Sequence, residues 1–331
     1  MSPPVQGSKG YNMVQFLIKR FIGLIFVVIC VTFITFILGY LAPGDPIKGL
    51  MGEHFDKLLY AQLRHQYGLD LPWYQQYLNY IGGLAHFDFG LSFHYEGRAV
   101  WNILKDGLPS SAELAAWGLL LTILLGVPLG IFSALKANTW IDTTSMSVAL
   151  VLYAVPVFVL AVVFQVIVVQ LNKVTGIYWP VSQWGTPWQY TPTDIQYKLL
   201  PILAFAALSF AGVARLARTS MMEVLGQDYV RTARAKGLRE KAVIYRHAFR
   251  NAMIPLVTFF GLALGTLVTG VFFIEQIFNI PGIGSTALTA ITDRDYPVIQ
   301  ATTVIAAIAV VLGNLISDIL YTVVDPRIKN E

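Results

Sequence analysis

Long stretches without any charged residue constrain this chain more than any other feature. A transmembrane helix needs about 20 mostly apolar residues to cross roughly 30 Å of hydrocarbon. Six stretches of about this length lie between successive charged residues: 21–44, 114–135, 143–172, 199–214, 251–274 and 296–317. Hydrophobic residues make up 56% of the chain and charged residues only 13%. We therefore predict an all-α membrane protein with six transmembrane helices.

Lysine and arginine residues predict the orientation, because cytoplasmic loops carry the positive excess. Lys9, Lys19 and Arg20 precede the first stretch. The fourth connection holds Arg215, Arg218, Arg231, Arg234, Lys236, Arg239, Lys241, Arg246 and Arg250. These sides are predicted to be cytoplasmic, so that both chain ends lie inside. The external connections are then residues 43–111, 173–198 and 275–295.

The predicted domain organisation has three parts. Residues 1–12 form a polar tail rich in turn formers, and residues 13–107 hold the first transmembrane helix and a long external segment. Residues 108–325 form the core domain. Its five helices are expected at about 112–135, 146–171, 199–218, 252–274 and 298–322, with a cytoplasmic loop at 219–251.

Motifs for enzymatic chemistry are absent from the sequence. It contains no G-x-x-x-x-G-K-[ST] phosphate loop, no G-x-S-x-G elbow and no H-E-x-x-H pair. Its histidines lack metal-ligand spacing, so that we expect no catalytic residue, metal site or bound cofactor. Glu275 and Asp318 lie near the ends of predicted helices, where we interpret them as interface residues rather than proton relays.

The stretch from residue 228 to 251 is the most densely basic part of the chain. It is too polar to span a membrane and rich in helix formers. Gly237 interrupts it as a helix-ending glycine does, which predicts a helix to Lys236, a turn at Gly237 and Leu238, and a second helix from Arg239 to about Asn251. A plain basic loop that sets the topology and contacts anionic membrane lipid is the alternative on charge alone.

Several motifs of the chain, taken in order, resemble one known family. "EVLGQDYVRTARAKGL" followed by "RHAFRNAMIP" is similar to the cytoplasmic signature of the membrane subunits of bacterial ABC importers, in the form of dipeptide and oligopeptide permeases. "LAPGDP", "HFDFGLSF", "FNIPGIG", "RDYPVIQ" and "DPRI" resemble the same family across nearly the whole chain. Arg231-Thr232-Ala233 occupies the place of a Glu-Ala-Ala motif in relatives that import other solutes. Pro255 comes later than in that general pattern.

The resemblance implies a type I ABC importer permease fold in the bacterial inner membrane. It also implies peptide import, with ATP and Mg bound by partner subunits and not by this chain. The implied partners are a second homologous permease, two ATPase subunits and an extracytoplasmic peptide-binding protein, with no nucleic acid. Related permeases serve dipeptides, oligopeptides, glutathione or chelated nickel, and the sequence leaves this choice open.

The resemblance also assigns candidate site residues. The predicted coupling helix, which docks on the ATPase in the family, comprises Asp228, Tyr229, Arg231, Thr232, Ala233, Arg234, Ala235, Lys236 and Gly237. Within it, Arg231 and Arg234 are expected to pair with acidic groups of the ATPase, and Tyr229 and Ala233 to supply contact area. The candidates for helix packing or the substrate passage are Pro156, Gly261, Gly265 and Gly270.

Two rival functions remain on the residues alone. An ion-coupled secondary carrier or channel would work without an ATPase, and it predicts a functional charge inside the membrane. A membrane scaffold without transport activity leaves the signature of the basic loop unexplained.

Overall fold

The computed structural model describes residues 13–51, 56–95 and 97–324. These residues are almost entirely helical, and their one extended pairing is an isolated bridge between Leu91 and Ala99. The helices are α1 Met13–Leu41, α2 Pro46–Met51, α3 Lys57–Gln66, α4 Trp73–Leu84, α5 Val100–Leu135, α6 Trp140–Ala154, α7 Val157–Thr175, α8 Pro192–Leu225, α9 Asp228–Ala235, α10 Glu240–Ala242, a π-helix Val243–Ala248, α11 Phe249–Phe278, α12 Ile283–Asp293 and α13 Tyr296–Val324.

Four helices in the described part of the chain are long and apolar enough to cross a membrane. They are α1, α5, α7 and α13. Helix α8 is a fifth if its two halves, which are bent by 46° relative to each other, form one span. The predicted fifth stretch lies in α11, where some side chains fall outside the described residues.

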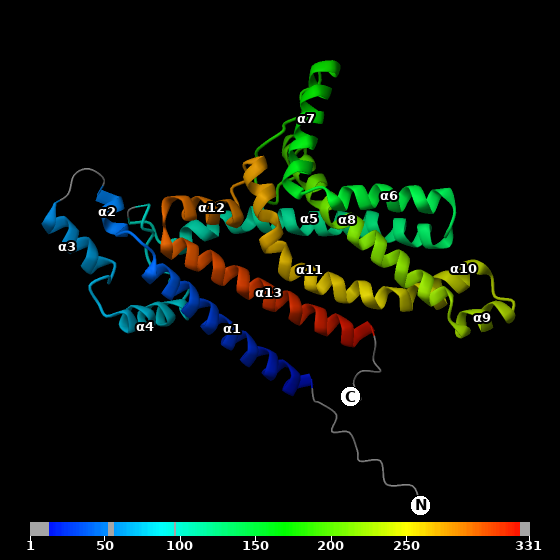
Figure 1. The fold of residues 1–331 in the computed structure, drawn as a ribbon, viewed down its shortest axis with the longest axis horizontal. Helices are drawn as coiled ribbons and strands as arrows, with labels where there is room; N and C mark the ends of the chain where they lie inside the picture. The colour runs from blue at the N-terminus through cyan, green and yellow to red at the C-terminus, as the bar shows by residue number, and fades with distance from the viewer. Residues whose placement is uncertain (1–12, 52–55, 96, 325–331) are drawn as a thin grey trace, which may run out of the picture.

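The predicted third span is not one continuous helix, which corrects the sequence-based expectation. The chain divides it into α6 and α7, with Val155 and Pro156 in extended conformation between them. Proline lacks the backbone N–H that would continue the helix, and it disfavours the helical conformation at the preceding residue. Pro156 therefore ends α6 and directs α7 away from the other long helices (Figure 1).

The long helices pack side by side, with α5 against α8, α11 against α13, and α1 along α13. Three glycines allow the closest of these approaches. A Cβ atom at Gly118 would lie 2.0 Å from Phe205, and one at Gly130 would lie 2.3 Å from the carbonyl oxygen of Ala214. A Cβ at Gly126 would lie 2.9 Å from Val213. Small residues on α5 thus let α8 approach its backbone.

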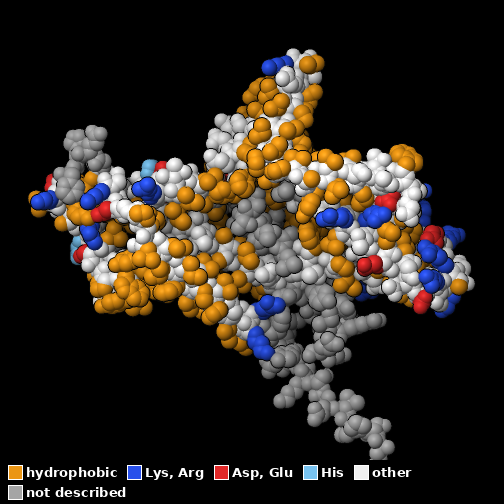
Figure 2. Space-filling model, in the orientation of Figure 1, with side chains coloured by type: hydrophobic (Ala, Val, Ile, Leu, Met, Phe, Trp, Pro, Cys, Tyr) orange, Lys and Arg blue, Asp and Glu red, His pale blue; other side chains and the backbone are white. Residues whose placement is uncertain are grey.

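The short helices gather at the two ends of the molecule's long axis (Figure 1). Helices α2, α3, α4 and α12 lie at one end, which we call the α3 end. Helices α9 and α10 lie at the other, which we call the α9 end. Lys and Arg side chains cluster over α9 and α10, whereas hydrophobic side chains cover the visible face of α7 (Figure 2).

Candidate functional site

The basic stretch folds into an elbow at the α9 end. Helix α9 spans Asp228–Ala235, and Gly237 follows with φ +76, in the left-handed region that favours glycine. The Gly237 backbone N–H donates to the Arg234 carbonyl at 2.9 Å. A second helical segment begins at Glu240 and continues through the π-helix into α11. The predicted turn between two helices is confirmed, and its second arm is continuous with a long helix of the bundle.

One face of α9 is buried against the body of the protein. Val230 and Ala233, three residues apart on the helix, pack with Val243 of the π-helix and with Val224 and Leu225 at the end of α8. Ala233 retains only 5% of its exposure. The expectation that Ala233 supplies contact area for a partner is therefore wrong, because the apolar pair selects the inward face. This packing attaches the elbow to α8 and α11.

The opposite face of α9 presents charge. Arg231 keeps 71% of its side-chain exposure, and its one ion pair in the described chain is a 3.4 Å contact with the exposed Asp228. Arg234 instead bridges the turn, and its guanidinium donates to both carboxylate oxygens of Glu240 at 2.8 and 3.2 Å. This hydrogen bond holds the pKa of Glu240 below its ordinary value. Arg231 is presented outward, whereas Arg234 braces the elbow.

The rest of the predicted coupling segment is also exposed. Tyr229 lies on the outer surface, where its hydroxyl accepts a hydrogen bond from the Asn251 amide at 2.7 Å. The Thr232 hydroxyl donates to the carbonyl of Asp228 at 2.9 Å, four residues earlier in the same helix. Ala235 and Lys236 are exposed. Tyr229 can therefore serve as contact area, as the sequence predicts.

A buried ion pair connects the elbow's supporting helix α8 to α6. The guanidinium of Arg218 donates to both carboxylate oxygens of Asp142, from Nε at 2.6 Å and from Nη2 at 2.7 Å. The Ser133 hydroxyl and the Asn138 backbone N–H donate to the same carboxylate. Asp142 is 3% exposed. Three segments, the end of α5, the start of α6 and α8, therefore meet at one side chain.

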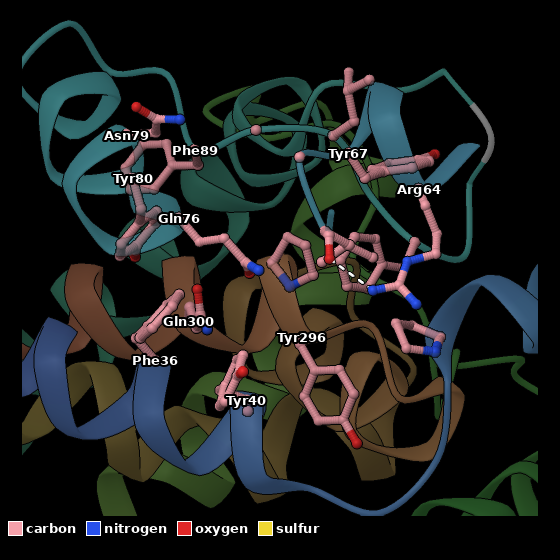
Figure 3. Close-up of a pocket in the computed structure, with 18 of the residues that line it drawn as sticks. Phe36, Tyr40, Arg64, Tyr67, Gln76, Asn79, Tyr80, Phe89, Tyr296 and Gln300 are labelled. Carbon is pink, nitrogen blue, oxygen red and sulfur yellow. Dashed lines mark hydrogen bonds between the residues drawn. The ribbon is translucent and has the colours of Figure 1, made fainter. Parts of the chain in front are cut away.

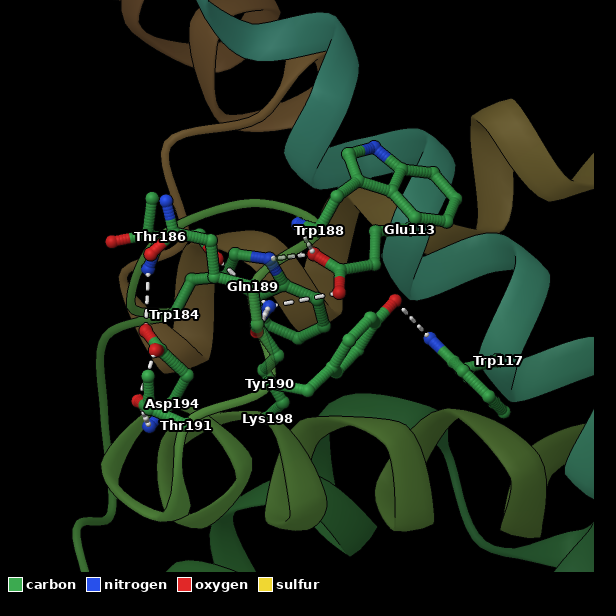
Figure 4. A network of polar contacts seen from close by, with 10 residues as sticks. All are labelled: Glu113, Trp117, Trp184, Thr186, Trp188, Gln189, Tyr190, Thr191, Asp194 and Lys198. Carbon is green, nitrogen blue, oxygen red and sulfur yellow. Dashed lines mark hydrogen bonds and ion pairs between the residues drawn. The ribbon is translucent and has the colours of Figure 1, made fainter.

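A second buried ion pair fixes the loop between α7 and α8 (Figure 4). Lys198 Nζ donates to Glu113 Oε1 at 2.8 Å, and both side chains are almost fully buried. The other carboxylate oxygen accepts from Trp184 Nε1 at 3.0 Å and from the Trp188 backbone N–H at 2.9 Å. Lys198 also donates to the carbonyls of Thr186 and Gln189. One lysine and one glutamate thus hold this loop against α5 and α8.

Two further carboxylates are enclosed near the α3 end. Glu275 is fully buried, accepts from the Ser111 hydroxyl at 2.5 Å and from the Ser285 backbone N–H at 2.9 Å, and so stabilises the start of α12. Helices α5 and α12 cover Glu275 near the end of α11, so it is enclosed by protein, and its position at the membrane interface stays a prediction. The Asp295 carboxylate accepts from the Ser92 hydroxyl and from the backbone N–H groups of Phe93 and His94. The side chain of Asp318 lies outside the described residues.

Comparison with known protein families decides the identity of the chain. A family model for the inner membrane component of binding-protein-dependent transport systems matches residues 126–330. The model for the N-terminal part of such membrane components matches residues 13–115. The chain belongs to the binding-protein-dependent transport system inner membrane component family.

Individual relatives of this permease match it over nearly their whole length. The dipeptide transport system permease protein of Escherichia coli (strain K12) is 35% identical over 340 residues, which cover 96% of this chain and 100% of that protein. The oligopeptide transport system permease protein of Bacillus subtilis (strain 168) is 35% identical over 319 residues, with the same two coverages. The glutathione transport system permease protein of Escherichia coli O1:K1 / APEC is 35% identical over 318 residues, which cover 96% of this chain and 99% of that protein.

A solved structure shows the same fold. An inward-facing form of the MetNI methionine ABC transporter has a chain that matches with a TM-score of 0.53 and 16% sequence identity. The match covers 67% of this chain and 96% of that chain. The permease is thus a multi-pass inner membrane protein with an ABC importer permease fold. It is a transport subunit and not an enzyme, and the reading as an ion-coupled carrier is set aside.

The four residues predicted for helix packing or the substrate passage lie on two different helices. Pro156 caps the start of α7. Gly261, Gly265 and Gly270 lie within α11, and their surroundings fall outside the described residues. The sequence reading missed the close contact of α5 with α8, although Gly118, Thr122, Gly126 and Gly130 recur every four residues there. Such a small-residue repeat is a readable signal for close helix packing. No local signal of this kind identifies the partners of Glu113 or Asp142.

Proposed function

We propose that this chain is the permease subunit of an ATP-driven importer that moves peptides across the inner membrane. The observation that carries the proposal is the elbow around Gly237. In this elbow α9 is packed on α8, and the Arg231 side chain is exposed on the protein surface. The names of the dipeptide and oligopeptide relatives support peptides as the substrate class. Dipeptides, oligopeptides, glutathione and chelated nickel stay open as the particular cargo.

In this proposal α9 is the docking element for an ATPase subunit. Its inward face, Val230 and Ala233, is fixed to the permease, and its outward face carries Arg231 and Tyr229. A rigid element can transmit a rigid-body movement of the ATPase into α8 and α11, whereas a flexible loop would absorb it. ATP and Mg are bound by two ATPase subunits and not by this chain, which carries no phosphate-loop motif.

A second, homologous permease chain completes the transmembrane unit. Helix α7 supports this, because only Leu160 and Ala161 of its 19 residues are buried and it stands apart from the bundle (Figure 1). Large side chains such as Phe158 and Ile167 lie exposed along it. Six spans with both chain ends inside are part of the proposal. The extracytoplasmic binding protein docks on residues 43–111, which include the helices of the α3 end, and on residues 174–198.

Substitutions in the elbow can distinguish loss of ATPase docking from damage to the fold of the elbow. Arg231→Glu should reverse the outward charge and reduce both co-purification of ATPase chains and peptide uptake. Arg234→Glu should weaken the turn as well, and the charge swap with Glu240→Arg should restore it, because the pair lies within the elbow. Gly237→Pro should abolish uptake, since proline cannot adopt a φ of +76.

A matched control separates these effects from general damage. Arg98→Glu changes an exposed arginine of the α3 end, and it should leave ATPase recovery unchanged. Membrane insertion is measured in parallel. Normal ATPase recovery and normal uptake in the Arg231→Glu variant would overturn the docking role of α9.

A further inference from the structure

A cavity of about 510 Å³ lies at the α3 end, away from the elbow (Figure 3). Six segments surround it: the end of α1, residues 44–46, the end of α3 with the turn after it, helix α4, the loop at residues 88–93 and the start of α13. Its volume falls in the range of small-molecule sites. The cavity sits where the apolar helix α1 gives way to the polar segment that follows, which places it at a membrane interface.

Aromatic rings and hydrogen-bonding groups line this cavity together. The rings belong to Phe36, Tyr40, Tyr67, Tyr80, Phe89, Phe93 and Tyr296. The Tyr80 hydroxyl is buried and has no hydrogen-bond partner within the described chain. A buried hydroxyl without a partner is costly. Gln76 and Gln300 add amide groups to the same wall, and Figure 3 shows both close to the Tyr80 side of the cavity.

The charges of the lining favour a ligand that carries an ammonium group. The lining includes two carboxylates, Asp45 and Asp88, and one cation, Arg64. The Tyr60 hydroxyl joins Asp45 to Arg64, because it donates to the carboxylate and accepts from the guanidinium. Asp88 has no ion pair among the described residues. One of its carboxylate oxygens accepts from the Gly90 backbone N–H at 2.9 Å, and its backbone carbonyl lies against Gly83 of α4, one turn from Tyr80. Aromatic faces beside an unpaired carboxylate attract a cation.

Arg64 lies at the opposite side of the cavity from Tyr80 (Figure 3). Its guanidinium donates to the Tyr60 hydroxyl and to the Leu69 carbonyl. A guanidinium has five N–H groups, so that it keeps donors for an anionic oxygen. The apolar residues Leu38 of α1 and Leu78 of α4 are each 64% exposed on the helices that form the cavity wall. Acyl chains can lie along these two side chains.

We propose that this cavity binds the headgroup of an aminophospholipid of the phosphatidylethanolamine type. The primary ammonium donates to Asp88, to the Tyr80 hydroxyl and to amide oxygens, and the phosphate accepts from Arg64. The acyl chains remain in the bilayer beside α1 and α4. A bound lipid of this kind ties the segment between α1 and α5 to the membrane. This site does not depend on the identity of the transported solute.

The test uses the intact complex in nanodiscs that contain phosphatidylethanolamine, phosphatidylcholine or phosphatidylglycerol, followed by detergent washing and native mass spectrometry. Phosphatidylethanolamine should be retained on this chain at least about tenfold more than the other two, because only a primary ammonium combines positive charge with N–H donors. Asp88→Asn and Tyr80→Phe should each lower that retention. Gly82→Ala is the matched control on α4, since a Cβ there meets open space.

Three results would overturn the proposal. The first is equal retention of all three lipids, and the second is unchanged retention in both variants. The third is retention of soluble phosphoethanolamine on this chain as strong as retention of the lipid. That result would make a free headgroup the ligand. Tyr80→Phe keeps the test decisive if Asp88→Asn fails to assemble, because the lost hydroxyl has no hydrogen-bond partner among the residues that the structure describes.

Discussion

The guanidinium of Arg218 holds the carboxylate of Asp142 through two hydrogen bonds of 2.6 and 2.7 Å, although the two residues are 76 positions apart in the chain. Arg218 lies on α8, two turns before the end at Leu225, and α9 packs against that end. Asp142 lies in the first turn of α6. Any movement of the elbow that displaces α8 must therefore move α6 or break this pair.

Arg218→Met should destabilise the permease by about 3 kcal/mol, the lower end of the range for removing one partner of a buried pair, because Arg218 keeps 24% exposure. The loss arises because Asp142 is left buried without a cation. Thermal unfolding of the purified complex in detergent measures it. The double variant Arg218→Met, Asp142→Leu should recover most of the loss, since no charge is then left uncompensated.

Asp106→Asn removes one partner of an exposed pair with Arg98 and provides the comparison. It should change stability by less than about 1 kcal/mol, as exposed ion pairs do. Equal losses from the exposed and the buried pair would contradict the assignment of Arg218 as a buried anchor.

Lys198→Met should release the loop between α7 and α8. Glu113 would then lose its cation inside the protein, at a cost of about 3 to 5 kcal/mol. The carbonyls of Thr186 and Gln189 would also lose their donor. Limited proteolysis should cleave within residues 176–191 much faster than in the unchanged protein.

The double variant Lys198→Met, Glu113→Gln is the control for this loop. A glutamine keeps an oxygen that can accept from Trp184 and from the Trp188 backbone. The resistance of the loop to proteolysis should therefore largely return. Cleavage of the double variant as fast as that of Lys198→Met would show that the charge of Glu113 is not the cause.

Gly130→Ala should disrupt the contact between α5 and α8. Its Cβ would lie 2.3 Å from the Ala214 carbonyl oxygen and 2.6 Å from the Ala217 side chain, and a backbone atom cannot move aside as a flexible side chain can. Overpacking of this kind costs about 1 to 3 kcal/mol. Gly23→Ala on α1, where a Cβ meets open space, should leave the melting temperature equal or higher. A Gly130→Ala protein as stable as Gly23→Ala would refute the close contact.

The pair of Arg234 and Glu240 predicts a pH dependence of the elbow. The hydrogen bond from Arg234 lowers the pKa of Glu240, so that the carboxylate is stabilised in the folded state. Its contribution is present above the ordinary pKa of glutamate and is lost as the pH falls through the lowered value. Amide hydrogen exchange in residues 236–242 should be slower than in Glu240→Gln at neutral pH. The difference should vanish in acid, and a difference that grows in acid would contradict the pairing.

The sequence predicted the elbow because its signals are local. Asp228, the helix formers after it and Gly237 act within a few residues, through helix propensity and the left-handed conformation that glycine permits. The side of α9 that faces inward was not predicted correctly. Ala233 is buried because α8 and the π-helix happen to pack there, and this depends on residues outside the motif.

The charged residues that delimit the apolar stretches show where sequence reasoning ends. Glu113, Asp142, Lys198 and Glu275 mark the ends of predicted spans, and for that purpose their charge alone suffices. Each is nonetheless buried in the fold. A charge can be buried where other elements bring opposite charges or hydrogen-bond donors to it. Asp142, Glu113 and Glu275 each have one such partner that lies 76, 85 and 164 residues away, respectively.

The sequence by itself therefore determined the membrane class, the presence of several long apolar helices, the elbow and the family. Each of these follows from composition, from short-range conformational preference or from motifs read along the chain. The tertiary structure alone decided the direction of α7 after Pro156, the inward face of α9, the partners of the buried charges and the cavity beneath Tyr80. These features depend on which helix surfaces meet, and contacts between distant segments leave no periodic pattern in the sequence of either one.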